Sequence, residues 1–224
     1  MTYAIVDTAK MFVANKDDGL RFRTFAGGAM VLTSEILAQR PTEFHFHADP
    51  AGIHISAQYF LSGEATILMG DGRAAFWSEN GMSIIRCDTP GFRLRVEAGQ
   101  TLKHVCVAMY HHDLTVLHAP NDNAPMMRLM AMGDPVNMAV PVPAGPKMRG
   151  KAEALHDLSR ENGIAGLKAE AMAMEFLADA LESYSALTNG SDIADDPAPW
   201  RSGAAGQAGH RRGPAGASWH RRSA

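Results

Sequence analysis

The sequence is poor in the features that mark several classes of protein. It has only two cysteines in 224 residues, Cys87 and Cys106, too few for a disulfide framework. No run of about 18 apolar residues occurs, so no membrane-spanning helix and no membrane partner are expected. Residues 1–10 lack the basic region and apolar stretch of a secretory signal. These absences predict a cytoplasmic protein whose thiols are free and buried in strands.

Two common signatures of catalysis and nucleotide binding are also missing. The sequence has no glycine-rich phosphate loop and no Gly-x-Ser-x-Gly pattern around a nucleophile. The charge, in turn, is unevenly distributed. The net charge is −3, and residues 197–224 hold five arginines and no acid, so residues 1–196 carry −8. An acidic body argues against nucleic-acid binding by that part of the chain.

Glycines recur at intervals of eight to ten residues through the middle of the chain. Between them lie short runs rich in β-branched and aromatic residues, which is typical of antiparallel sandwiches and barrels. The clearest run has Phe92, Leu94 and Val96 alternating with charged residues, as in a half-buried strand. The glycines are Gly63, Gly72, Gly81, Gly91 and Gly99. Further strands are expected at 30–39, 43–47, 53–61, 65–69, 73–77, 82–86 and 102–110.

The hydrophobic period changes after residue 110. Helices are expected at 113–118, 123–132, 148–160 and 164–187, with an irregular proline-containing linker before the third. In the longest helix, apolar residues step by four and three positions. This spacing fits either packing on the barrel or a dimerisation seam shared with a second subunit. The residues are Leu167, Ala171, Met174, Ala178 and Leu181.

The composition changes again after residue 190. The last segment has Ile193, Trp200 and Trp219 as its large apolar residues and is dominated by Gly, Ala, Pro, Ser and Arg. Such a segment buries too little surface to offset its chain entropy, so a disordered basic tail is expected. The expected organisation is an N-terminal arm at 1–28, a β-barrel at 29–110, a helical segment at 111–190 and the tail at 191–224.

Four short motifs in this order resemble the sensor domain of AraC/XylS-type bacterial transcription regulators. The stretch 166–183 is similar to the linking helix of members that respond to siderophores, so the likeness spans roughly 25–187. The resemblance implies a mainly β fold, a cupin-like (jelly-roll) barrel followed by C-terminal helices. The motifs are His45-Phe46-His47, Tyr59-Phe60-Leu61-Ser62-Gly63-Glu64, Asp71-Gly72-Arg73 and Pro90-Gly91.

The resemblance also implies a function. Family members are often dimers. They sense a small-molecule effector, here a siderophore-like one, and control transcription through two helix-turn-helix motifs in a second domain. Residues 191–224 contain no recognition helix. Our hypothesis is that truncation or a lost reading frame has removed that domain. The chain is then expected to be a homodimeric sensor, not an enzyme, which reaches DNA only through a domain absent from it.

The His-x-His motif also bears on metal binding. His45 and His47 fall on one face of a strand, as at the start of the metal site of metal-dependent cupins. The glutamate that normally follows is replaced by Ala51-Gly52, and Phe92-Arg93 stands where a later histidine is expected. We therefore predict no metal, no cofactor and no catalytic residue. The residues expected to contact the ligand are His45, His47, Tyr59 and Trp77.

Two alternatives remain open from the sequence. The first is a stand-alone metal-dependent cupin enzyme that uses His45 and His47, with His54 and His104 as further candidates. Stoichiometric metal in the purified protein would favour it. The second is a truncated, dominant-negative partner whose helix at 164–187 pairs with an intact regulator. A strictly monomeric protein, alone and mixed with that regulator, would argue against it.

Overall fold

The computed structural model describes residues 2–6, 19–47, 54–70, 72–87, 91–117, 129–130, 137–158 and 163–189. Most of the helix expected at 123–132 and all of the predicted tail at 191–224 lie outside these residues. Within the described ranges, none of the helices has the length and apolar character needed to cross a membrane.

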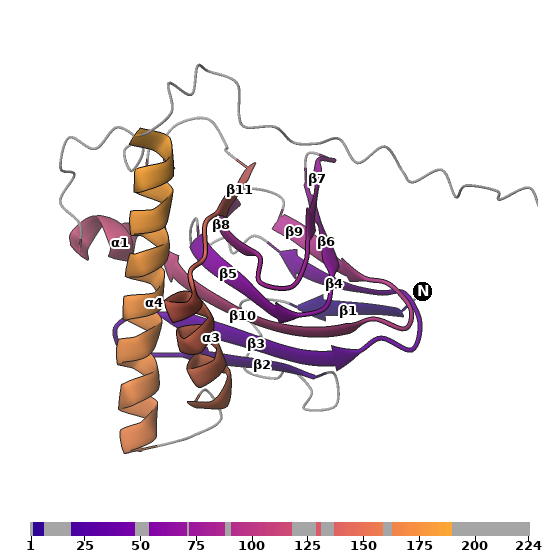
Figure 1. The fold of residues 1–224 in the computed structure, drawn as a ribbon, viewed down its shortest axis with the longest axis horizontal. Coiled ribbons are helices and arrows are strands. Elements are labelled where there is room, and N and C mark those ends of the chain that lie inside the picture. Colours follow the sequence, from indigo (N-terminus) through magenta and orange to yellow (C-terminus); the bar gives the residue numbers. More distant parts are fainter. Residues whose placement is uncertain are drawn as a thin grey trace, which may run out of the picture.

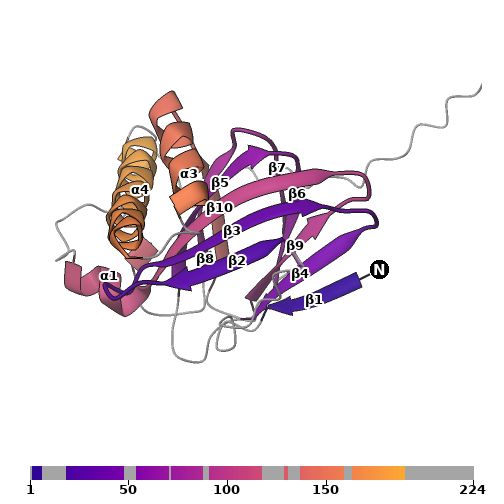
Figure 2. The same cartoon turned by 90° about the horizontal axis from the view of Figure 1, so that it is seen from below.

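The described strands form two sheets that face each other as a sandwich (Figure 2). All neighbouring strands are antiparallel except β1, which runs parallel to β4. The five-stranded sheet has the order β1 (Thr2–Val6), β4 (Thr42–His47), β9 (Gly91–Val96), β6 (Ala65–Met69) and β7 (Ala74–Trp77). The six-stranded sheet has the order β11 (Asn137–Val142), β8 (Met82–Cys87), β5 (His54–Ser62), β10 (Thr101–Tyr110), β3 (Met30–Leu37) and β2 (Leu20–Thr24).

Helices cover one side of this sandwich. The short helix α1 (His111–Leu117) continues directly from β10, whereas α3 (Pro146–Leu158) and α4 (Ile164–Asn189) lie side by side on the outer face of the six-stranded sheet (Figures 1 and 2). The six-stranded sheet is thus covered on both faces, by helices on one and by the other sheet on the other.

Two apolar clusters fill these two layers. Successive side chains of a strand point to opposite faces, so one strand supplies both clusters. On β5, Ala57 and Tyr59 pack under the helices together with Phe176 of α4, whereas Phe60 packs against the five-stranded sheet. We call the first surface of the six-stranded sheet its helix-covered face and the second its inner face.

The mainly β architecture with C-terminal helices confirms the fold class expected from the glycine spacing. Three strands lie outside the predicted barrel range 29–110: β1 and β2 belong to the sheets although they fall in the predicted arm, and β11 occupies the predicted irregular linker. The prediction of an irregular linker here was wrong. It rested on prolines such as Pro141, which lies within β11. Since β11 is an edge strand, its proline does not interrupt the sheet.

Helix α4 packs on the sheet through a face different from the predicted heptad. Its buried residues include Ala173, Phe176 and Ala180. Of the predicted heptad positions, Leu181 is buried, whereas Leu167 is 68% exposed. Ala171 and Ala178 are exposed as well. Most of the heptad therefore lies away from the core.

Candidate functional site

Polar side chains gather on the inner face of the six-stranded sheet. His104 and Cys106 on β10 alternate with Val105 and Val107, which pack under the helices, so the polar pair faces the other sheet. The same alternation turns polar residues of β3, β5 and β8 inward. All are buried, and we call them together the polar track: Ser34, Ser56, Gln58, Ser83, His104 and Cys106.

Strand register places these side chains next to one another. His104 is paired with Ser34 on one side and with Phe60 on the other. In the adjacent inward-facing row, Cys106 is paired with Gln58, which in turn is paired with Ser83. Directly paired residues have Cβ atoms about 4.5–5.5 Å apart, so the polar track is one contiguous surface over four strands.

His104 is the most informative member of the track. Its side chain is 2% exposed, its Nδ1 lies 3.3 Å from the Ser34 Oγ, and its ring centroid lies 5.0 Å from that of Phe60. Burial, reinforced by the nearby His156, lowers the pKa of the His104 imidazole from 6.5 to about 3. The ring is therefore neutral at physiological pH, and its Nε2 has no hydrogen-bond partner among the described residues.

In the interior between the sheets, two further buried polar atoms also lack a hydrogen-bond partner among the described residues: the Ser83 hydroxyl and the Trp77 indole N–H. The Trp77 ring is stacked at 6.5 Å from that of Phe60, so it belongs to the same inner region as His104. Most buried polar groups in proteins are hydrogen-bonded, and an unmet one costs roughly 1–3 kcal/mol. Three such atoms therefore lie around one interior.

Other members of the track are partnered. The Ser56 hydroxyl donates to the Ile85 carbonyl at 3.5 Å. Burial raises the pKa of the Cys106 thiol to about 12, although its hydrogen bond with Ser56 acts in the opposite direction. Cys106 is thus a protonated, buried thiol and not a reactive thiolate.

The opposing surface of the five-stranded sheet is apolar. It presents Phe44, Phe46, Ile67 and Leu94 to the polar track, all of them buried. The buried charged residues among the described ones, Glu43 and Arg86, belong to other surfaces. Glu43 alternates with Phe44 and lies on the outer side of its sheet, whereas Arg86 lies under the helices and donates to the Leu129 carbonyl at 2.7 Å. The described interior therefore contains no charged side chain.

The two ends of this interior differ. At the end where β8 leads towards β9, the rings of His54 and Tyr110 lie 4.4 Å apart, and both residues are partly exposed. The stacked pair Phe46 and Phe92, with centroids 4.6 Å apart, belongs to the same end of the opposite sheet. The other end, around Phe60, is buried. The end beside His54 and Tyr110 is therefore the more exposed of the two.

The predicted ligand residues do not come together. Trp77 faces the interior, but Tyr59 lies under the helices, where its hydroxyl is 3.5 Å from the Asn80 Oδ1 and burial raises the pKa of its phenol. His45 lies on the outer side of the five-stranded sheet. The side chain of His47 is outside the described residues. A site that includes His45 or Tyr59 would thus not be the interior one.

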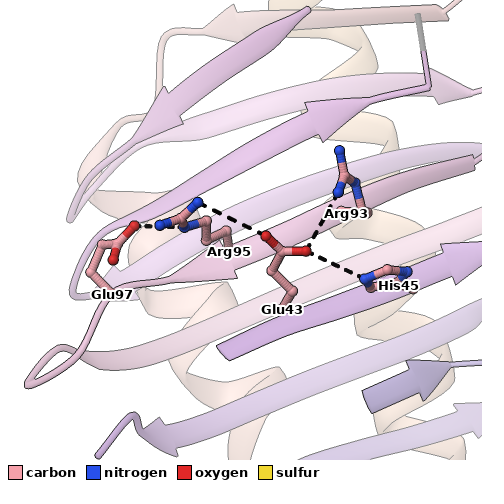
Figure 3. A network of polar contacts seen from close by, with 5 residues as sticks. All are labelled: Glu43, His45, Arg93, Arg95 and Glu97. Carbon is pink, nitrogen blue, oxygen red and sulfur yellow. Dashed lines mark hydrogen bonds and ion pairs between the residues drawn. The ribbon is translucent and has the colours of Figure 1, made fainter. Parts of the chain in front are cut away.

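The surroundings of His45 form a polar network on that outer side (Figure 3). The Glu43 carboxylate, only 5% exposed, lies 3.4 Å from the His45 Nε2, 3.5 Å from Arg93 and 4.0 Å from Arg95. Arg95 also contacts Glu97 at 2.7 Å. The buried Glu43 carboxylate is thus surrounded by Arg93, Arg95 and the His45 ring.

Metal binding has no support in the described ranges, because they contain no cluster of three or more His, Cys, Asp or Glu that would fit around an ion. His54 and His104, the further sequence candidates, lie at opposite ends of the polar track. Of these two histidines, His104 is the one that is buried in the interior. Its only signal in the sequence is a histidine within an apolar strand.

Solved structures similar to this chain come from several bacteria. Apo ToxT from Vibrio cholerae has 12% identity and a TM-score of 0.43, covering 78% of this chain and 62% of its own. A cupin protein from Bacteroides fragilis has 17% identity and a TM-score of 0.29, covering 37% and 66%. A protein with a double-stranded β-helix domain from Klebsiella pneumoniae has 15% identity and a TM-score of 0.33, covering 43% and 87%. The chain thus spans less than two thirds of the first two. No curated protein sequence matches it.

Sequence comparison at the family level is decisive. The family model described as the regulatory protein PchR N-terminal domain matches residues 20–193, which run from β2 to beyond the end of α4. The match includes both sheets, except β1, and all the described helices. It confirms the resemblance to the sensor domain of AraC-type regulators, and the chain belongs to the PchR N-terminal domain family.

Proposed function

We propose that the chain senses a small-molecule effector bound between its two sheets and thereby controls transcription from the cytoplasm. The supporting observation is the polar track with its unmet hydrogen-bonding atoms: the His104 Nε2, the Ser83 Oγ and the Trp77 Nε1. An effector that supplies the missing partners gains their hydrogen bonds without competition from the protein. Apolar surroundings with a few convergent polar groups are typical of small-molecule sites.

Binding at this site has a short structural connection to the helices. Phe60, which contacts His104, is bonded through its backbone to the turn before β8: its N–H donates to Gly81 at 2.9 Å, and its carbonyl accepts from Asn80 at 2.8 Å. The Asn80 side chain accepts a hydrogen bond from Arg149 of α3. A shift of Phe60 would therefore be transmitted to α3.

The two long helices move together in this proposal. Lys151 of α3 contacts the carboxylates of Glu175 and Asp179 on α4. An effector that favours one position of Phe60 would favour one position of the helix pair, because a ligand shifts an equilibrium only through different affinities for its two states. The helix pair is then the output of the sensor.

The exposed side of α4 supports the predicted homodimer. Ile164 is 77% exposed and Leu167 is 68% exposed, and the exposed Ala171 and Ala178 continue the same stripe. We propose that a second copy packs there. Leu167→Glu is then expected to convert dimers to monomers in light scattering, whereas Leu37→Glu, at an exposed leucine of β3 outside the stripe, is not. Monomers of the unchanged protein would contradict the proposal.

The interior site is tested with a fragment set in saturation-transfer NMR. Fragments that bind the unchanged protein are expected to lose their signals with His104→Phe, because the imidazole is removed from the track. They are expected to keep them with His45→Gln, whose side chain lies on the outer side of the other sheet. If His104→Phe retains every hit, or if the unchanged protein gives none, the effector site is not between the sheets.

A further inference from the structure

The chemistry of the interior also indicates what kind of effector fits it, if the proposed site is correct. Resting on that proposed function, we propose that the effector is an uncharged, planar molecule that carries hydroxyl, carbonyl or amide groups and lies beside Phe60, Trp77 and His104. Three independent observations support this: the charge, the ring arrangement and the hydrogen-bonding atoms of the inner faces.

The first observation is the lack of a charge partner. A buried ion without an opposite charge is strongly disfavoured in an apolar interior. The inner surfaces of the described strands carry no Asp, Glu, Lys or Arg. Arg86 faces the helices and Arg93 contacts Glu43 on the outer side of the other sheet, so neither reaches an anion between the sheets.

His104 does not replace the missing cation. It is fully buried and its Nδ1 is engaged with Ser34, which leaves a neutral ring with a single available nitrogen. Its pKa of about 3 means that the ring stays uncharged at neutral pH, so it offers an anionic ligand no opposite charge. A neutral ligand can form a hydrogen bond with Nε2 while the ring remains uncharged.

The second observation is the arrangement of rings. Phe60 is tilted by 40° to His104 and nearly parallel to Trp77, with an interplanar angle of 13°. Nearer the partly exposed end, Phe46 and Phe92 are stacked with an interplanar angle of 14°. Flat aromatic surfaces at both ends favour a flat ligand, because offset stacking and edge contacts stabilise aromatic pairs.

The third observation is the set of unmet atoms. The Trp77 N–H is a donor only, so it requires an acceptor such as a carbonyl or hydroxyl oxygen. The Ser83 hydroxyl both donates and accepts, and so satisfies an amide or a second hydroxyl. Neutral groups meet these requirements without bringing a charge into the interior.

Salicylamide and salicylate form a matched pair of probes, because they share the ring and the hydroxyl and differ in an amide against a carboxylate. Each is titrated into the full chain at neutral pH, and the ring resonances of ¹³C-labelled histidine are followed, with that of His104 identified by its loss in His104→Phe. Salicylamide is expected to shift the His104 resonance. Salicylate is expected to bind at least about tenfold more weakly.

Variants then locate the binding. Ser83→Ala, which removes one unmet hydroxyl, is expected to weaken salicylamide binding by about fivefold or more, the loss of roughly one hydrogen bond. His45→Gln on the outer side is the control and is expected to leave the affinity unchanged. Equal losses in both variants, or none in Ser83→Ala, would overturn the placement of the amide.

The outcomes separate this inference from the function on which it rests. If salicylate shifts the His104 resonance with equal or higher affinity, the site stands and the requirement for an uncharged ligand is wrong. If neither probe perturbs His104 up to its solubility limit, and the fragment set also gives no His104-dependent binding, both the site and this inference are overturned.

Discussion

The two faces of the six-stranded sheet are made by the same strands, but they differ in whether their buried polar groups have hydrogen-bond partners. Under the helices, Arg86 donates to the Leu129 carbonyl, and the Tyr59 hydroxyl lies against Asn80. On the inner face, His104 and Ser83 keep polar atoms without partners among the described residues. On the helix-covered face these partners come from the turn before β8 and from Leu129, whereas the opposing sheet brings apolar side chains to the inner face.

This difference separates stability from binding. The helix-covered face is a conventional core, because its buried polar groups have hydrogen-bond partners within the protein. On the inner face, some buried polar atoms lack such partners, which is why we propose it as the place for a ligand. Substitutions on the first face should therefore cost stability, and those on the second should cost little stability but change binding.

The largest effect is expected from Phe176→Ala, which breaks the helix-covered face at a fully buried ring. Loss of a buried phenylalanine leaves a cavity and should lower the free energy of unfolding by about 3–5 kcal/mol. Urea denaturation measures it. The matched control is Phe76→Ala, since Phe76 is 64% exposed and should change the value by less than about 0.5 kcal/mol. Similar losses for both would contradict a core under the helices.

Acid should lower the free energy of unfolding through His104 on the inner face. Its pKa is 6.5 in the unfolded chain and about 3 in the folded protein, so between these pH values the unfolded state binds more protons. The stability contribution is complete above pH 6.5 and is lost as the pH falls, by about 1.4 kcal/mol per pH unit.

His104→Gln should remove this slope, because glutamine does not titrate. Urea denaturation at a series of pH values, compared between the variant and the unchanged protein, isolates the His104 contribution from that of other groups. Parallel pH profiles for the two proteins would show that His104 is not held neutral.

A smaller change in the free energy of unfolding should distinguish hydroxyls with a hydrogen-bond partner from those without one on the inner face itself. Ser83→Ala removes a hydroxyl without a partner, so the free energy of unfolding should stay within about 0.5 kcal/mol or rise. Ser56→Ala breaks the bond to the Ile85 carbonyl and should cost about 1 kcal/mol. Thermal denaturation of both variants checks the order, and a larger loss for Ser83→Ala would reverse our interpretation.

A comparably small effect is expected at the edge of the helix-covered face. Lys151→Met removes the contacts with Glu175 and Asp179 and should lower the free energy of unfolding by about 0.5–1 kcal/mol, mostly at low salt. Because these contacts join α3 to α4, the variant should also weaken any coupling of effector binding to dimerisation. Unchanged coupling would show that the helices do not move as a pair.

Short-range sequence patterns predicted strands that are bounded by turn residues, although β6 and β7 are the only consecutive strands among β5 to β10 that pair with each other. The glycine spacing located β5 to β10 because each is short, apolar on at least one face and bounded by turn residues. The pairing of β1 with β4 joins residues about forty positions apart, and no local pattern encodes it. The prolines that hid β11 are tolerated because it lies at the edge of its sheet.

The candidate site was harder to predict, for a related reason. The period of a strand shows that His45 and His47 share a side, but not which side faces the interior. The clue was present, since Phe44 and Phe46 alternate with the polar residues and are the better candidates for burial. On β10 no such clue exists, because both faces are buried and His104 stands among apolar residues on either side.

The amino-terminal strand has a practical consequence. β1 lies at the margin of the five-stranded sheet and occupies the side of β4 that would otherwise be open. An open strand offers its N–H and C=O groups to any other extended chain, and apolar examples aggregate. Trimming residues 2–6 would uncover β4, which carries Phe44 and Phe46. A segment that the sequence marks as an N-terminal arm is therefore an integral strand of the sheet.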